Sequence, residues 1–114
     1  AVRLRPWADA AAACAEADVV ISTLPPRGAD DLADRLAAAP QTAVPGSVLL
    51  DVAYDPWPSR IAEVWAAQGG RIVPGLEMLL YQAVEQVRLF AGGKFREENA
   101  VTNVMCDAVG APRR

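Results

Sequence analysis

The sequence predicts an α/β protein built on a parallel β-sheet, and three observations support that fold class. Three short apolar runs occur along the chain, and segments with helical spacing of apolar residues separate them. Proline or glycine bounds each run, which limits it to strand length. Strands that alternate with helices imply right-handed crossovers and therefore parallel pairing. We expect three to four short parallel strands with flanking helices, and one further helix at the C-terminal end.

The predicted strands are apolar along most of their length. A run without polar alternation is typical of a strand that is buried on both faces, as in parallel sheets. Val2–Pro6 instead alternates like a short edge strand that proline ends, as if the chain were entered partway through a sheet. The three buried strands are predicted at Val19–Thr23, Ser47–Val52 and Arg71–Pro74.

The predicted helices are bounded by familiar start and stop signals. Pro40 ends one of them and Pro45-Gly46 marks the turn that follows, while Gly69-Gly70 and Gly92-Gly93 end two others. The helix that starts at Gly75 carries an apolar stripe at helical spacing, formed by Leu76, Leu80, Ala83, Val87 and Phe90. The helices are expected at Ala8–Ala17, Ala29–Ala39, Pro58 or Ser59 to Gln68, Gly75 to the Gly92-Gly93 pair, and Arg96–Val109.

Composition excludes several classes of function. A net charge of −3 with scattered arginines argues against a nucleic-acid-binding surface. The longest apolar runs are too short to span a membrane and no secretory signal is evident, so a cytoplasmic protein is expected. The sequence contains no histidine, which excludes the classical hydrolase triads. Cys14 and Cys106 lack the spacing of metal ligands or a redox pair, so free thiols and no metal site are expected.

The carboxyl ends of the predicted strands should lie along one rim, where open α/β sheets bind ligands. At this rim a tyrosine, Tyr54, follows the second strand, and a glycine, Gly75, permits close backbone approach. Asp51 is interpreted as a turn or cap residue rather than a catalytic group. The rim comprises Thr23–Pro25, Asp51–Pro56 and Val73–Gly75.

Several segments at this rim resemble the C-terminal portion of shikimate dehydrogenase, with the same order and spacing. They are Ile21–Pro25, Asp51–Ser59, Gly69-Gly70 and, most specifically, Gly75–Ala83. The resemblance extends from Val2 to Gly92. It implies the second half of a Rossmann-like three-layer sheet, with residues 1–93 as a partial NAD(P)-binding domain and residues 94–114 as a C-terminal helix and tail.

The resemblance also implies an activity and a set of site residues. The activity is the NADP-dependent interconversion of 3-dehydroshikimate and shikimate in aromatic amino-acid biosynthesis, with NAD as an alternative cofactor. Tyr54 matches a tyrosine that borders substrate and nicotinamide, and Gln82 matches a glutamine that hydrogen-bonds a substrate hydroxyl. The residues expected on the cofactor side are Thr23, Val52, Gly75 and Met78.

Two parts of the family pattern have no counterpart in these residues. The family's catalytic lysine and aspartate belong to an N-terminal substrate domain, and Lys94 at a helix boundary does not replace that lysine. The glycine-rich loop that would bind the pyrophosphate at a helix N-terminus is also missing. We therefore expect this chain to position ligands without supplying a catalytic residue, and to be inactive when isolated.

Two alternatives to a shikimate dehydrogenase remain open at this point. The chain could come from a relative that acts on quinate or another hydroxylated cyclohexane carboxylate, with NADP or NAD. It could also be a non-catalytic fragment that self-associates as a homodimer or binds a partner, because an incomplete sheet leaves an edge and apolar helix faces uncovered. Light scattering would distinguish this second alternative from a monomer.

Overall fold

The computed structural model describes residues 1–39 and 46–114, so the predicted helix end at Pro40 and the proline of the Pro45-Gly46 turn lie outside the described residues. The chain divides into two compact units, Ala1–Gly75 and Leu76–Arg114. Each unit is considered by itself below.

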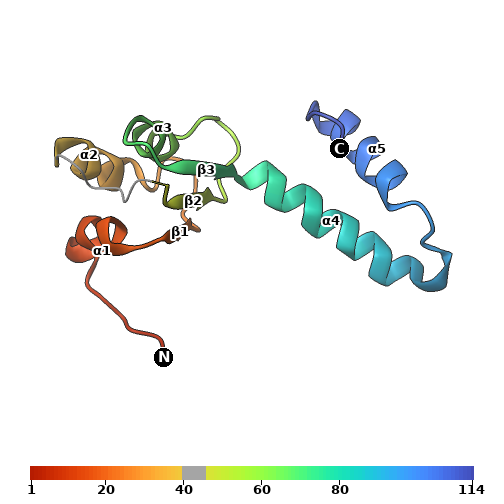
Figure 1. Ribbon diagram of the computed structural model, residues 1–114, viewed down its shortest axis with the longest axis horizontal. Helices are drawn as coiled ribbons and strands as arrows, with labels where there is room; N and C mark the ends of the chain where they lie inside the picture. Colours follow the sequence, from red (N-terminus) through yellow and green to blue (C-terminus); the bar gives the residue numbers. More distant parts are fainter. Residues whose placement is uncertain (40–45) are drawn as a thin grey trace. The chain divides into compact units, whose positions relative to one another are not determined.

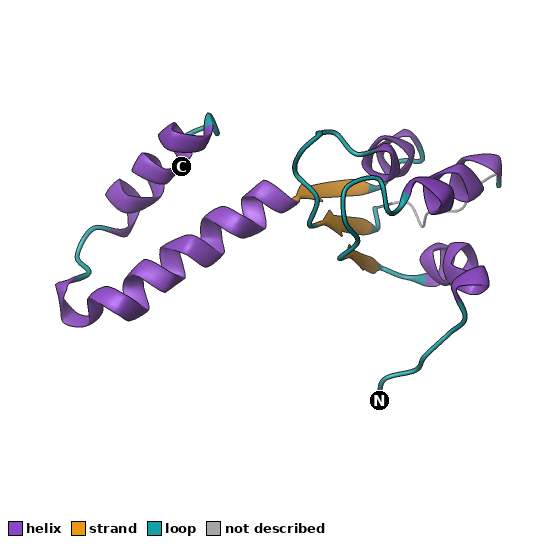
Figure 2. Ribbon diagram, turned by 180° about the vertical axis from the view of Figure 1, so that it is seen from behind, coloured by secondary structure: helices purple, strands orange, loops and turns teal. Residues whose placement is uncertain are grey.

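The first unit contains a three-stranded parallel sheet, as the sequence predicts (Figures 1 and 2). The strands are β1 (Val19–Ser22), β2 (Val48–Asp51) and β3 (Arg71–Pro74), in the order β1-β2-β3. Their last residues, Ser22, Asp51 and Pro74, pair across the sheet. Because the strands run parallel and end in register, the segments that follow them leave from one edge.

Helices join these strands at nearly the predicted positions. A 3₁₀ turn, η1 (Trp7–Asp9), leads into α1 (Ala10–Glu16), and α2 (Asp30–Ala38) lies between β1 and β2. The next helix, α3 (Arg60–Ala67), begins after Ser59, whose side chain accepts a hydrogen bond from the Ala62 N–H at 3.3 Å. A serine at this position satisfies a backbone donor that the first helical turn leaves unpaired.

The core of the first unit lies on one face of the sheet. It includes Leu36, Leu49 and Trp65, which are completely buried, and the Trp65 indole N–H donates to the Ser47 carbonyl at 3.4 Å. Burial raises the pKa of the Cys14 thiol, while the charge of Arg35 opposes that shift. The core cluster consists of Cys14, Ala29, Leu32, Ala33, Leu36, Leu49, Ile61 and Trp65.

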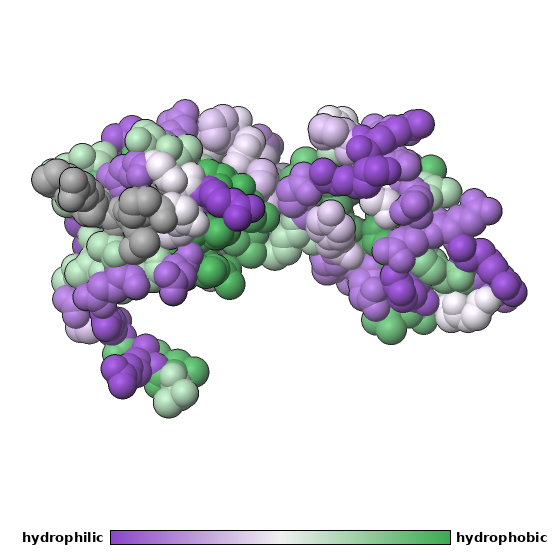
Figure 3. Space-filling model, in the orientation of Figure 1, coloured by the Kyte–Doolittle hydropathy of each residue, from purple (hydrophilic) through white to green (hydrophobic). Residues whose placement is uncertain are grey.

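The opposite face of the sheet is exposed within this unit, which corrects the prediction that β1 is buried on both faces. Val19 and Ile21 each keep 60% of their surface exposed, whereas Ser22 on the core side is buried. Figure 3 shows hydrophobic surface over the strands of this unit. The reason is that the core side chains of α1, α2 and α3 gather on one face only.

The predicted strand at Val2–Pro6 does not form. Val2 and Leu4 are 92% and 95% exposed, and residues 1–6 have no regular secondary structure. Alternation alone does not make a strand, because a strand also needs a neighbour that takes up its backbone hydrogen bonds. In the described sheet, only β1, β2 and β3 pair with one another.

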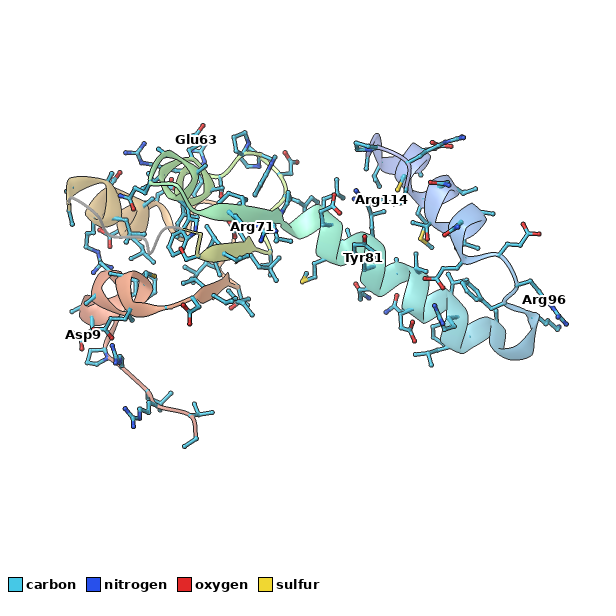
Figure 4. All side chains as sticks on the ribbon, viewed as in Figure 1. Asp9, Glu63, Arg71, Tyr81, Arg96 and Arg114 are labelled. Carbon is cyan, nitrogen blue, oxygen red and sulfur yellow. The ribbon has the colours of Figure 1, made fainter. Side chains whose placement is uncertain are left out.

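The second unit is formed by two helices joined by a short turn. Helix α4 (Gly75–Ala91) begins directly after β3, and η2 (Gly92–Lys94) leads to α5 (Glu98–Val109). Arg88 pairs with Glu98, and Arg114, labelled in Figure 4, pairs with Glu77. These two ion pairs link α4 to α5 and to the tail that follows it.

Only part of the predicted stripe on α4 is covered. Its first half lines an apolar groove of about 200 Å³ with α5, whereas Phe90 at the far end of the stripe is 91% exposed. Phe90 lies two turns beyond Ala83, the last α4 residue in the groove. The groove is lined by Leu76, Leu79, Leu80, Ala83, Met105, Ala108 and Val109.

Among the residues that the structure describes, no helix is long and apolar enough to cross a membrane. Within residues 1–39 and 46–114, no group of three or more histidine, cysteine, aspartate or glutamate side chains is arranged to hold a metal ion.

Candidate functional site

An open groove of about 610 Å³ lies where β1 and β2 end. It brings together three residues that the sequence predicts at a ligand site: Thr23 after β1, and Val52 and Tyr54 after β2. Leu24 and two prolines supply apolar surface, and the Tyr54 side chain remains 53% exposed. The complete lining is Thr23, Leu24, Pro25, Pro26, Val52, Ala53, Tyr54 and Asp55.

The backbone of Val52 is fixed from two sides. Its N–H donates to the Ser22 carbonyl at 3.0 Å, which extends the pairing of β1 and β2 by one residue. On the other side, a Cβ placed on Gly75 would lie 2.2 Å from the Val52 carbonyl oxygen. Such a distance is far below van der Waals contact, so the close packing of two backbones requires glycine at this position.

Gly75 therefore has a structural role that the sequence reasoning did not identify. The family resemblance implies a place for Gly75 on the cofactor side, and that assignment stays a prediction. The structure places another strand's backbone, the end of β2, against it. Glycine directly after a short strand is the signal that could have indicated this packing.

Asp51 organises the loop that carries Tyr54. Its side chain is buried, Oδ1 accepts a hydrogen bond from the Ala53 N–H at 3.2 Å, and Oδ2 accepts one from the Ser59 hydroxyl at 2.6 Å. These contacts agree with the interpretation of Asp51 as a turn residue. The bond to Ser59 was missed, because it joins residues eight apart across a loop whose path the sequence does not specify.

Trp57 lies within the same loop. With Pro58 it lines an apolar groove of about 350 Å³ that also involves α3 and β3. Its side chain is partly exposed.

Met78 and Gln82 belong to the second unit. Both lie on α4, one turn apart, and both side chains are exposed. Residues at this spacing share one face of a helix, so a methionine and an amide are presented side by side. Their assignment to cofactor and substrate stays a prediction.

Comparison with known proteins identifies relatives of this chain, although no family model matches it. Over 44 residues it is 43% identical to an NADP(+) shikimate dehydrogenase of Leptospira interrogans, covering 39% of this chain and 15% of that enzyme. Over 82 residues it is 30% identical to the NADP(+) shikimate dehydrogenase of Dehalococcoides mccartyi, covering 72% of this chain and 28% of that enzyme.

Solved structures show the same relationship over more of the chain. The shikimate dehydrogenase of Mycobacterium tuberculosis superposes with a TM-score of 0.64 at 40% identity, covering 87% of this chain and 35% of that protein. A shikimate 5-dehydrogenase from Mycobacterium fortuitum gives a TM-score of 0.64 at 39% identity, covering 85% and 33% respectively. The chain thus spans about a third or less of the length of these relatives.

Proposed function

We propose, from the homology of most of this chain to shikimate dehydrogenases, that it is the C-terminal part of an enzyme that reduces 3-dehydroshikimate to shikimate with NADPH. The observation that carries this proposal is the superposition on the mycobacterial enzyme at 40% identity over 87% of the chain. The segments that carry the resemblance fall within the first 83 residues, and two of them, Ile21–Pro25 and Asp51–Ser59, contribute residues to the groove at the ends of β1 and β2. We further propose a cytoplasmic enzyme of aromatic amino-acid biosynthesis.

The groove beside β1 and β2 fits the nicotinamide end of a dinucleotide. Its volume of about 610 Å³ and its lining of valine, leucine and proline suit a flat ring. Thr23 and Tyr54 add hydroxyl groups that can hydrogen-bond a polar ligand. Thr23, Val52, Gly75 and Met78 would hold the cofactor, which when bound supplies the hydride.

This chain would bind and orient ligands in the reaction. Tyr54 and Gln82 would contact the substrate, because a phenol and an amide can hydrogen-bond its ring hydroxyls. The proton-transfer pair and the pyrophosphate-binding loop would come from the N-terminal part of the polypeptide. In this scheme, residues 1–93 form part of the cofactor-binding domain, and residues 94–114 form a C-terminal helix and tail.

Substrate and cofactor can be identified with the whole protein. We expect faster turnover with shikimate and NADP⁺ than with quinate and NAD⁺, measured as the rate at which reduced nicotinamide appears. A higher kcat/KM for quinate would favour the quinate-type relative. Activity with neither substrate would contradict the enzyme assignment.

The role of Gln82 leads to a separate prediction. Gln82→Ala in the whole protein should raise KM for shikimate about tenfold with a small effect on kcat, because one hydrogen bond to a substrate hydroxyl is lost. Steady-state kinetics measures both constants. Gln86→Ala is the matched control, since Gln86 is also exposed on α4, one turn further along. An unchanged KM in Gln82→Ala would remove Gln82 from the site.

A further inference from the structure

We propose that Asp51 and Ser59 are positioning residues: the hydrogen bond between them closes the loop of residues 52–59 and holds Tyr54 at the groove before any ligand binds. The inference rests on the proposed function for the meaning of the groove. Its structural basis is independent of that function, because it consists of contacts within the first unit.

The first end of the loop is immobilised at the sheet. Val52 donates its N–H to the Ser22 carbonyl at 3.0 Å, and its own carbonyl packs against Gly75. Asp51 adds a hydrogen bond from the next amide, the N–H of Ala53, to its Oδ1 at 3.2 Å. Val52 and Ala53, which directly follow β2, are therefore both held at the end of the sheet.

The second end of the loop is tied to the same carboxylate. The Ser59 hydroxyl donates to Asp51 Oδ2 at 2.6 Å, and it also accepts from the Ala62 N–H at 3.3 Å. One hydroxyl thus joins the end of β2 to the first turn of α3. Since Asp51 is buried, with 2% of its surface exposed, water competes little for these bonds.

Tyr54 lies between these two fixed ends. Its phenol makes no hydrogen bond to any residue that the structure describes, and its side chain is half exposed. Its position at the groove therefore depends on the backbone of the loop. A loop held at both ends reduces the conformational freedom that ligand binding would otherwise have to remove.

Kinetics of the whole protein test this inference. Ser59→Ala should raise KM for shikimate about tenfold, since a hydrogen bond to a charged group is lost. Ser59→Thr should leave KM close to that of the unmodified protein, because threonine retains the hydroxyl. Ser47→Ala is the matched control, since Ser47 is buried and its hydroxyl has no hydrogen-bond partner among the described residues. That control should leave KM unchanged.

A double-mutant cycle separates positioning from general destabilisation. If Ser59 acts through Tyr54, Ser59→Ala should have little further effect on KM in a Tyr54→Phe background. A purely structural role would lower the melting temperature and change the kinetics equally in both backgrounds. Equal KM ratios in the two backgrounds would overturn the inference.

Amide hydrogen exchange tests, without any substrate, whether the hydrogen bond between Asp51 and Ser59 holds the loop in place. Asp51→Ala and Ser59→Ala should both accelerate exchange at the Ala53 amide, whereas Ser47→Ala should not. Unchanged exchange at Ala53 in both variants would overturn the inference. If the whole protein oxidises neither shikimate nor quinate, the proposed function fails. Exchange at Ala53 then decides by itself whether the hydrogen bond between Asp51 and Ser59 fixes the loop.

Discussion

The 114-residue chain, purified by itself, is expected to show no measurable oxidation of shikimate and no tight binding of NADP⁺. The proposed scheme assigns proton transfer to a lysine and an aspartate outside these residues, and such groups contribute about 10²- to 10⁴-fold to a rate. It also assigns the pyrophosphate to a glycine-rich loop that these residues do not contain. Appearance of reduced nicotinamide and a fluorescence titration with NADPH measure the two quantities.

The whole protein at the same concentration is the control for this experiment. It should turn over shikimate under conditions in which the 114-residue chain does not. Turnover by the purified chain at a comparable rate would contradict the proposal that this chain binds ligands while residues outside it transfer the proton. It would also require a proton-transfer group within these residues.

Gly75→Ala is expected to destabilise the first unit strongly. The added Cβ would lie 2.2 Å from the Val52 carbonyl oxygen and 2.8 Å from that of Asp51. Both neighbours are backbone atoms, which cannot rotate away as a side chain could. We expect a loss of about 3 kcal/mol in the free energy of unfolding, at the upper end of the range for overpacking. Denaturant unfolding of the whole protein measures it.

Gly93→Ala provides the matched control. Gly93 has no atom within 4 Å of the position that a Cβ would occupy, and it does not have a positive φ angle. Alanine there should change the free energy of unfolding by less than about 1 kcal/mol. If Gly75→Ala were as stable as Gly93→Ala, the backbone of Asp51 and Val52 could not lie as close to Gly75 as the structure places it.

Local sequence signals were sufficient for most of the fold. Val48–Asp51 forms a strand because its side chains suit a pleated surface, and Ser59 starts a helix because its hydroxyl satisfies a first-turn amide. The same signals failed at Val2–Pro6 and for the outer face of β1. Both cases depend on what lies beside the segment, which the local sequence does not specify.

The candidate site was partly predictable for the same reason. Thr23, Val52 and Tyr54 follow strand ends, and parallel pairing in register brings them to one groove. The bond from Asp51 to Ser59 depends on the path of the intervening loop, and local patterns do not determine such a path. The packing of Gly75 depends likewise on the distance between two backbones.

The strands β1 and β2 end in register, so the length of β2 determines where Val52 and Tyr54 lie in the groove. Leu49 and Asp51 face the core side and alternate with Val48 and Leu50. A single-residue deletion within β2 would exchange the two faces, so that Asp51 would leave the core side and Val52 would shift along the groove. Insertions and deletions within β2 would therefore disrupt the core and the candidate site together.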